Sequence, residues 1–316
     1  MTAKTSDFMT TLQKRLIDER GITESSANKY LQLLFTLNDK TPFKNLAWTK
    51  KYEELEKKID TYAKNTQYIF YNALVSTLSL LADKPTYKPI HKYWSQKVAE
   101  GKVERSQADP HEKSEVQQEN WTEWEDVLKK KQQLDTDISN FHSLKKLNPS
   151  QYDTLLQLVI LSLYTDIPPR RNQDYQFMYV VKKLPKDAPT DRNYYDIASK
   201  QFIFNKYKTS KTYGQAKVDI PESLQNVLSL YVKHHPLSKT KEKNGFPFLV
   251  KFDGTPLNNV NGINRILNKL FGKRVGSSML RHSYLTSKYG NTIKEMEQDG
   301  IDMAHSTAVQ STYIKE

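Results

Sequence analysis

Apolar residues recur at helical spacing in the first hundred residues of the chain. Residues 22–38 and 65–83 place them every three or four positions. The members of these two stripes are Tyr30, Leu33, Leu34, Leu37, Phe70, Leu74, Leu78 and Leu81. This period is that of an α-helix with one apolar face. We therefore predict a helical N-terminal domain whose core is built from the two stripes.

A second apolar pattern starts at residue 148 and predicts a long helix. Asn148 and Pro149 are typical of the cap and the first position of a helix. The residues predicted on its buried face are Leu155, Leu158, Val159 and Ser162. This helix has to end before Pro168 and Pro169, because proline interrupts helical hydrogen bonding.

Strand-like runs follow this helix. They are residues 175–181, 200–207 and 216–221. The last two flank a turn-forming segment, residues 210–215, which contains Gly214, so they predict a β-hairpin. Helical patterns return after Glu222. The predicted fold is therefore mainly α with a small antiparallel β-sheet, the sheet belonging to an α+β second domain.

A polar stretch, residues 99–119, separates the two regions and predicts a linker. We divide the chain into a helical domain (residues 1–110), an acidic linker with a lead-in helix (residues 111–145) and a second domain (residues 146–316).

Composition limits the class of protein further. The chain has 316 residues, of which 37% are hydrophobic and 27% charged, and it contains no cysteine. No apolar run approaches the roughly 20 residues of a membrane span, and the N-terminus lacks the apolar core of a signal peptide. Without cysteine there can be no disulfide and no thiolate zinc site. We expect an intracellular protein that is neither secreted nor held in a membrane.

The charge is strongly positive, with a formal net charge of +12. Residues 1–110 carry 18 basic and 13 acidic side chains, residues 111–145 carry 5 and 8, and residues 146–316 carry 25 and 15. Two basic blocks thus flank an acidic stretch. This distribution indicates binding to a polyanion, since neutralised phosphates release their counterions.

Four segments carry the types of side chain needed to cut a DNA phosphodiester with a phenol. They are TDIPPRRNQDY (165–175), NKYKTSKTYGQAKVDIP (205–221), MLRHSYLTS (279–287) and MAHSTAVQSTYIKE (303–316). Arginine binds phosphate in a bidentate manner, and preorganised cations stabilise the extra negative charge of a pentacoordinate transition state. A lysine or histidine can protonate the leaving oxygen, while a tyrosine can form the covalent intermediate.

These segments resemble the motifs of the tyrosine recombinases, the family of Cre and the phage integrases. LRHSYLTS is similar to the second arginine box and implies Arg281 as a catalytic arginine. MAHSTAVQSTY is similar to the histidine box and nucleophile, implying His305 as a phosphate ligand and Tyr313 as the nucleophile. Arg171, followed three residues later by Asp174, matches the first arginine box. Arg170 is then a phosphate-binding neighbour.

The family's catalytic lysine lies on a β-hairpin between the two arginine boxes. Lys208 and Lys211 both fit this context, and Lys208 is preferred because it ends the longer predicted strand. The resemblance spans residues 145–316 by motif. Over residues 1–110 it is limited to helical, basic character like that of the family's core-binding domain.

The resemblance implies a site-specific recombinase or integrase that works without a metal or nucleotide cofactor. It further implies double-stranded DNA as the partner, a homotetramer on two DNA sites, and a DNA-containing compartment such as the cytoplasm or nucleus of a host. A virus, transposon or plasmid is the expected source.

Two features depart from the family. Ser278 stands where the family usually has histidine or lysine, which weakens or displaces one phosphate contact. Only three residues follow Tyr313, so the usual exchange of a helix beyond the nucleophile is not expected here.

Two alternatives remain open at this point. One is a type IB topoisomerase, which shares the chemistry but rejoins the same strand. The other is a catalytically silent DNA-binding protein that descends from a recombinase. Walker-type glycine loops, zinc-ligand spacing and serine elbows are all lacking in the sequence.

Overall fold

The structure is a computed structural model that describes residues 6–107, 112–240, 245–257 and 261–314. The chain divides into two compact units, Met1–Glu112 and Lys113–Glu316, each with its own hydrophobic core. The boundary predicted at residue 110 lies within 108–111, outside the described residues. Helices dominate both units, and among the described residues none is long and apolar enough to cross a bilayer.

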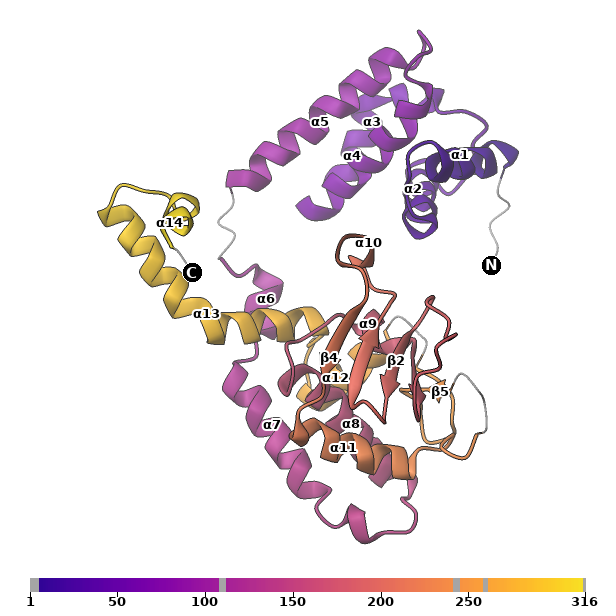
Figure 1. Cartoon of the computed structure of the whole chain (residues 1–316). Coiled ribbons are helices and arrows are strands. Elements are labelled where there is room, and N and C mark those ends of the chain that lie inside the picture. Colours follow the sequence, from indigo (N-terminus) through magenta and orange to yellow (C-terminus); the bar gives the residue numbers. More distant parts are fainter. Residues whose placement is uncertain (1–5, 108–111, 241–244, 258–260, 315–316) are drawn as a thin grey trace. The chain divides into compact units, whose positions relative to one another are not determined.

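The N-terminal unit is entirely helical within its described part (Figure 1). Its elements are α1 (Asp7–Asp18), α2 (Glu24–Leu37), η1 (Ala47–Lys50), α3 (Tyr52–Asp60), α4 (Lys64–Leu78), η2 (Ser79–Leu81) and α5 (Lys88–Gln107). The two predicted apolar stripes lie on α2 and on α4 with η2. Leu34, Leu37, Leu74 and Leu78 are buried, which confirms the helical reading of both segments.

The polar segment predicted as a linker is largely helical. Helix α5 continues through it to Gln107, and α6 (Glu115–Asn120) begins with a capping box between Ser114 and Gln117. The residues of this segment are mostly Glu, Lys, Gln and Arg, which are good helix formers even where no apolar face is buried. A polar composition therefore indicated exposure correctly but not the absence of regular structure.

The C-terminal unit surrounds the buried helix α8 (Pro149–Thr165), which is packed by α7 (Trp124–Asp137), α11 (Glu222–His234) and α12 (Gly262–Phe271) (Figure 1). Asn148 and Gln151 form a reciprocal capping box at the start of α8, and Pro149 occupies the first turn. The predicted face of α8 is buried, and so are six other residues of this helix. This confirms α8 and its N-terminal cap.

A five-stranded sheet lies beside these helices in the order β4-β3-β2-β1-β5. The strands are β1 (Met178–Val181), β2 (Asn193–Asp196), β3 (Gln201–Phe204), β4 (Ala216–Asp219) and β5 (Phe246–Pro247). The predicted hairpin is present, because β3 and β4 pair antiparallel with Phe202 opposite Val218. The prediction that the sheet is antiparallel was wrong for one pair of strands. Strands β1 and β2 are parallel, since residues 182–192 carry the chain back before β2 begins.

The C-terminal end of the chain forms α13 (Ser277–Asp302) and the short α14 (Thr307–Tyr313). The sequence pattern predicts a helix that reaches Gly290, but α13 continues without interruption to Asp302. Its first two turns are packed, with Met279, Leu280 and Ser283 buried. Beyond them most side chains of α13 are exposed, as the apolar Leu285 and Tyr289 show.

Candidate functional site

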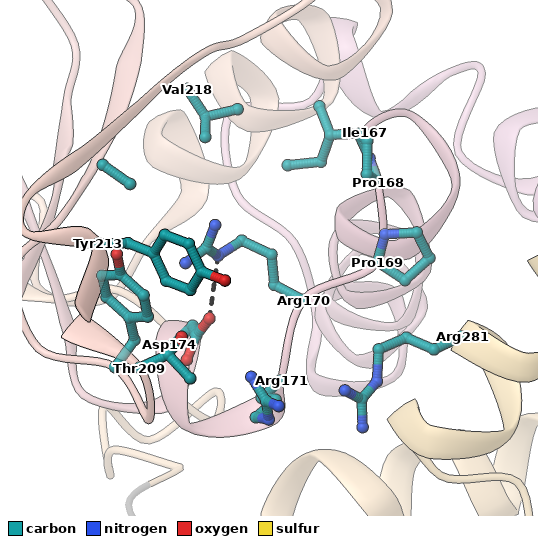
Figure 2. A pocket seen from close by; sticks show the side chains of 12 residues that line it. Ile167, Pro168, Pro169, Arg170, Arg171, Asp174, Thr209, Tyr213, Val218 and Arg281 are labelled. Atoms are coloured by element: carbon teal, nitrogen blue, oxygen red, sulfur yellow. Dashed lines mark hydrogen bonds and ion pairs between the residues drawn. The ribbon is translucent and has the colours of Figure 1, made fainter. Parts of the chain in front are cut away.

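A pocket of about 540 Å³ opens in the C-terminal unit where three segments meet. These are the connection from α8 to α9 (Asn172–Gln176), the connection from β3 to β4, and the start of α13. The residues that line it are Ile167, Pro168, Pro169, Arg170, Arg171, Asp174, Tyr207, Thr209, Tyr213, Ala216, Val218 and Arg281 (Figure 2). Three arginines and one carboxylate thus share one concave surface.

Local backbone chemistry places the two adjacent arginines at this pocket. Helix α8 ends at Thr165, and the two prolines hold the following residues in an extended path. Arg171 has extended dihedral angles (φ −78°, ψ 150°) and is the N-cap residue of α9. Because successive side chains of an extended segment point to opposite sides, Arg170 and Arg171 enter different surroundings.

Arg170 is engaged within the protein. Its Nε donates a hydrogen bond of 2.9 Å to the buried carboxylate of Asp174, and its guanidinium lies 3.9 Å from the ring centroid of Phe204. Burial raises the pKa of Asp174 above its ordinary value, while the nearby Arg170 and Arg171 oppose this shift. The charge of Arg170 is therefore needed to compensate a buried carboxylate.

Arg171 and Arg281 face each other without such compensation. Figure 2 shows their guanidinium groups on the same side of the pocket, with Arg170 turned toward Asp174. Neither guanidinium has a carboxylate partner among the residues that the structure describes. Burial, and next the positive charge of Arg171, lower the pKa of Arg281. Two like charges held together at a pocket form a site that an anion would stabilise.

Two hydrogen bonds and one close packing contact connect the backbone segments that carry these two arginines. The hydroxyl of Tyr164 donates to Oδ1 of Asn172 (2.6 Å), and Nδ2 of Asn172 donates to Oδ1 of Asn264 on α12 (2.8 Å). Gly276, the N-cap of α13, packs so closely on Asn264 that a Cβ atom there would lie 2.9 Å from Oδ1. Asn264 thus lies between the start of α9, next to Arg171, and the start of α13, one turn before Arg281.

The two candidate lysines lie in the connection from β3 to β4 but do not line this pocket. Lys208 is exposed and lines a neighbouring pocket, and Lys211 is exposed on α10 (Ser210–Tyr213). Tyr207, Thr209 and Tyr213 from the same connection line the arginine pocket instead. The assignment of Lys208 or Lys211 as the proton donor stays a prediction.

His305 and Tyr313 come together at the other end of α13. Their rings stack with centroids 5.6 Å apart and an interplanar angle of 15°. The backbone N–H of His305 donates to the carbonyl of Gly300 (2.7 Å). A Cβ atom added to Gly300 would lie 2.8 Å from the backbone oxygen of His305. Glycine at position 300 thus permits α14 to fold back on the end of α13. The Tyr313 side chain is 63% exposed.

The six predicted residues therefore do not form one cluster within a single chain. An α-helix rises about 1.5 Å per residue, so the stretch of α13 from Arg281 to Asp302 covers about 30 Å. Helix α14 packs on the far end of α13, away from the sheet and α12 (Figure 1). The two arginines meet in one place, and the histidine and the tyrosine meet in another.

Sequence reasoning missed Asn172 and Asn264, which carry the link between the two arginine segments. Asn172 follows Arg171 directly, but Asn264 has no local signal, since its role arises only from packing of α12. Ser278, where the family usually has a cation, is exposed on the first turn of α13.

In chemical terms the arginine pocket can bind a doubly or singly charged oxyanion such as a phosphate diester. Across the described ranges, no group of three or more histidine, aspartate or glutamate side chains is arranged to hold a metal ion. No family model matches the chain, and no curated protein matches it either.

Proposed function

We propose that the protein breaks and rejoins DNA strands through a covalent tyrosine intermediate, as tyrosine recombinases do. The observation that carries this proposal is the pair formed by Arg171 and Arg281, two guanidinium groups at one pocket, neither of which forms an ion pair within the described residues. A surface that merely keeps the protein dissolved has no reason to hold like charges together in a half-buried position. A phosphate diester supplies the negative charge that this arrangement lacks.

In the proposed reaction Tyr313 gives up its phenolic proton to water, and its oxygen attacks the phosphorus atom between two nucleotides. The bond to the 5′ oxygen breaks, that oxygen takes up a proton, and the strand end remains attached as a 3′-phosphotyrosyl ester. Arg171 and Arg281 stabilise the negative charge of the transition state, each contributing about 3 kcal/mol. The proton comes from Lys208 or Lys211, and His305 assists in holding the phosphate.

Attack by the 5′ hydroxyl of a second strand reverses the reaction and joins the new pair of strands. Two such exchanges between two DNA sites give integration or excision. We propose double-stranded DNA as the partner, four protomers on two sites as the working assembly, and a DNA-containing compartment as the location. The net charge of +12 supports a polyanionic partner.

The proposed chemistry requires Tyr313 to reach a phosphate held by the two arginines. Helix α14, which carries Tyr313, packs on the far end of α13, and that end lies about 30 Å along the helix from Arg281. Either α13 therefore breaks during the reaction or a second protomer supplies the phenol. The same separation favours one alternative, a DNA-binding protein that descends from a recombinase and no longer cuts. A type IB topoisomerase, acting as a monomer, would need α13 to break.

The decisive experiment traps the covalent adduct on nicked duplex DNA. The nick lets the short fragment beyond the cut diffuse away, so that religation is prevented. We expect a DNA-linked protein band with the wild type and none with Tyr313→Phe, although both bind DNA equally. Transfer of the trapped strand to a competing duplex supports a recombinase over a topoisomerase. Salt-dependent DNA binding without any adduct would replace the proposal by the silent DNA-binding protein.

A further inference from the structure

A second pocket, of about 620 Å³, adjoins the arginine pocket. Tyr207 lines both of them. We call this second pocket the aromatic pocket, because three rings line it together with three cations. These residues are Phe177, Tyr179, Tyr207, Arg192, Lys206 and Lys208.

One ring of the aromatic pocket, that of Phe177, is exposed for stacking. Phe177 follows the end of α9 and is 48% exposed, which is unusual for a phenylalanine. The guanidinium of Arg192 lies 4.8 Å from the ring centroid of Tyr179, and Arg170 lies 5.1 Å from that of Tyr207 on the side of the arginine pocket. These contacts orient two of the rings, while Phe177 offers an exposed ring to a ligand.

The charge of the aromatic pocket is positive. Arg192 forms an ion pair with Asp191 (3.0 Å), which also lines the pocket. Lys206 and Lys208 are exposed and have no carboxylate partner within the described part of the chain. A ligand that combines a flat ring with negative charge fits this lining, and a nucleotide of a DNA strand has both.

The frame of the aromatic pocket is held by the buried Asn193 on β2. Its Nδ2 donates to the carbonyls of Asp174 (2.8 Å) and Lys206 (3.0 Å), and its Oδ1 accepts from the N–H groups of Asn205 and Lys206. All the hydrogen-bonding capacity of this amide is thus used to tie α9 to the connection from β3 to β4. The pocket is preorganised, so a ligand need not order it.

We propose that the aromatic pocket binds an unpaired nucleobase of the DNA strand beside the phosphate held by Arg171 and Arg281. This inference rests on the proposed function. A base within a duplex is stacked on its neighbours and cannot offer its face to Phe177. Cutting one strand leaves a free 5′ end whose last bases can unpair, and the shared wall at Tyr207 places that end next to the aromatic pocket.

Two labelled probes test the inference with the full-length protein by fluorescence anisotropy. One is a nicked duplex with a few unpaired thymines at the 5′ end of the strand that begins at the nick, and the other is the same nicked duplex fully paired. We expect the wild type to bind the unpaired probe about tenfold more tightly, as stacking of one base on an aromatic side chain would give. Phe177→Ala should remove this preference and Phe177→Tyr should keep it.

Two further variants serve as controls. Tyr289→Ala removes an aromatic side chain of similar exposure on α13, outside both pockets, and should leave the preference unchanged. Lys206→Ala should weaken binding of both probes. It should also reduce the slope of log affinity against log salt concentration by about one, because one fewer counterion is released. Thermal unfolding of each variant establishes that it is folded, which the exposure of these side chains favours.

The outcomes separate this inference from the proposed function. Equal affinity of the wild type for the two probes overturns the aromatic pocket as a base site, even if the covalent adduct forms. Equal loss of affinity for both probes in Phe177→Ala also overturns it. A preference that depends on Phe177 supports the base site, and it does so even if no adduct is found and the recombinase proposal fails.

Discussion

The two ends of α13 differ in how they are held, although they belong to one helix. At the first end Leu280 is fully buried, and the network through Asn264 fixes the backbone before Arg281. At the other end Ile301 and Met303 are exposed, and the short α14 packs against it. Under the proposed function, the packed end that carries Arg281 is the preorganised one, and the exposed end with α14 is the one that can be repositioned.

The largest effect is expected from mixing two inactive variants. Arg281→Ala should lower adduct formation by at least about 10²-fold, and Tyr313→Phe should abolish it. Because α13 keeps its own Tyr313 far from Arg281, we expect a mixture of the two variants to regain adduct formation through phenol supplied between protomers. The adduct assay on nicked duplex measures this. An inactive mixture alongside an active wild type would show that α13 breaks and serves its own arginines.

Truncation of one buried and one exposed leucine of α13 tests where its packing stops. Leu280→Ala should lower the free energy of unfolding by about 2–5 kcal/mol, because it leaves a cavity in the core. Leu285→Ala, five residues further along at a position that is 52% exposed, should change it by less than about 0.5 kcal/mol. Urea unfolding followed by circular dichroism measures both. Similar losses would mean that Leu285 is covered in solution.

Acid should destabilise the packed region of the C-terminal unit through His235. Its Nδ1 accepts from the N–H of Leu237, so Nε2 carries the proton and donates to the carbonyl of Phe248 (3.2 Å). Burial lowers the pKa of His235 to about 4.

The unfolded chain takes up this proton near pH 6.5 and the folded chain only near pH 4. Stability from His235 is therefore complete above pH 6.5 and lost as the pH falls toward 4, by about 3 kcal/mol in total. Urea titrations across this range should show that the free energy of unfolding of the wild type falls as the pH falls. The slope of this free energy against pH should be smaller in His235→Gln. Equal slopes would mean that His235 does not titrate in this way.

Asn264→Ala should loosen the link between the segments that carry Arg171 and Arg281. We expect adduct formation at saturating DNA to fall by about tenfold, since misplacement of a phosphate ligand weakens transition-state stabilisation. Asn268→Ala, one turn further along α12, is the matched control and should retain the wild-type rate. A loss of stability without a change in rate would show that Asn264 supports the fold alone.

The smallest effect is expected at Gly290, in the middle of α13. An added Cβ atom would meet only the Thr286 side chain, at 3.6 Å, so Gly290→Ala should stabilise the helix by about 0.5–1 kcal/mol. Hydrogen exchange along the second half of α13 should slow accordingly. Gly276→Ala is the contrasting case, because its Cβ atom would collide with Asn264 and lower stability. Slower adduct formation in Gly290→Ala would point to a break in α13 during the reaction.

Local patterns in the sequence were sufficient for several elements, although not for the length of α13 or for the helices in the polar segment. The cap at Asn148, the stripes on α2 and α4, and the hairpin of β3 with β4 all follow from spacing between near neighbours. Strand β2 was not predicted, because Asn193 and Asp196 are polar. Hydrogen bonds with distant backbone groups allow these two side chains to be buried. Its parallel pairing with β1 likewise depends on the path of residues 182–192.

The sequence by itself determined which side chains are available and in what order, including the arginines of residues 165–175 and 279–287 and a late tyrosine. The tertiary structure decided that Arg170 forms an ion pair with Asp174, that Arg171 and Arg281 share a pocket, and that Tyr313 lies elsewhere. The physical reason is the range of the interactions. Helical periodicity and capping act over a few residues, whereas the meeting of two charges depends on how packed helices and strands hold segments that lie over a hundred residues apart.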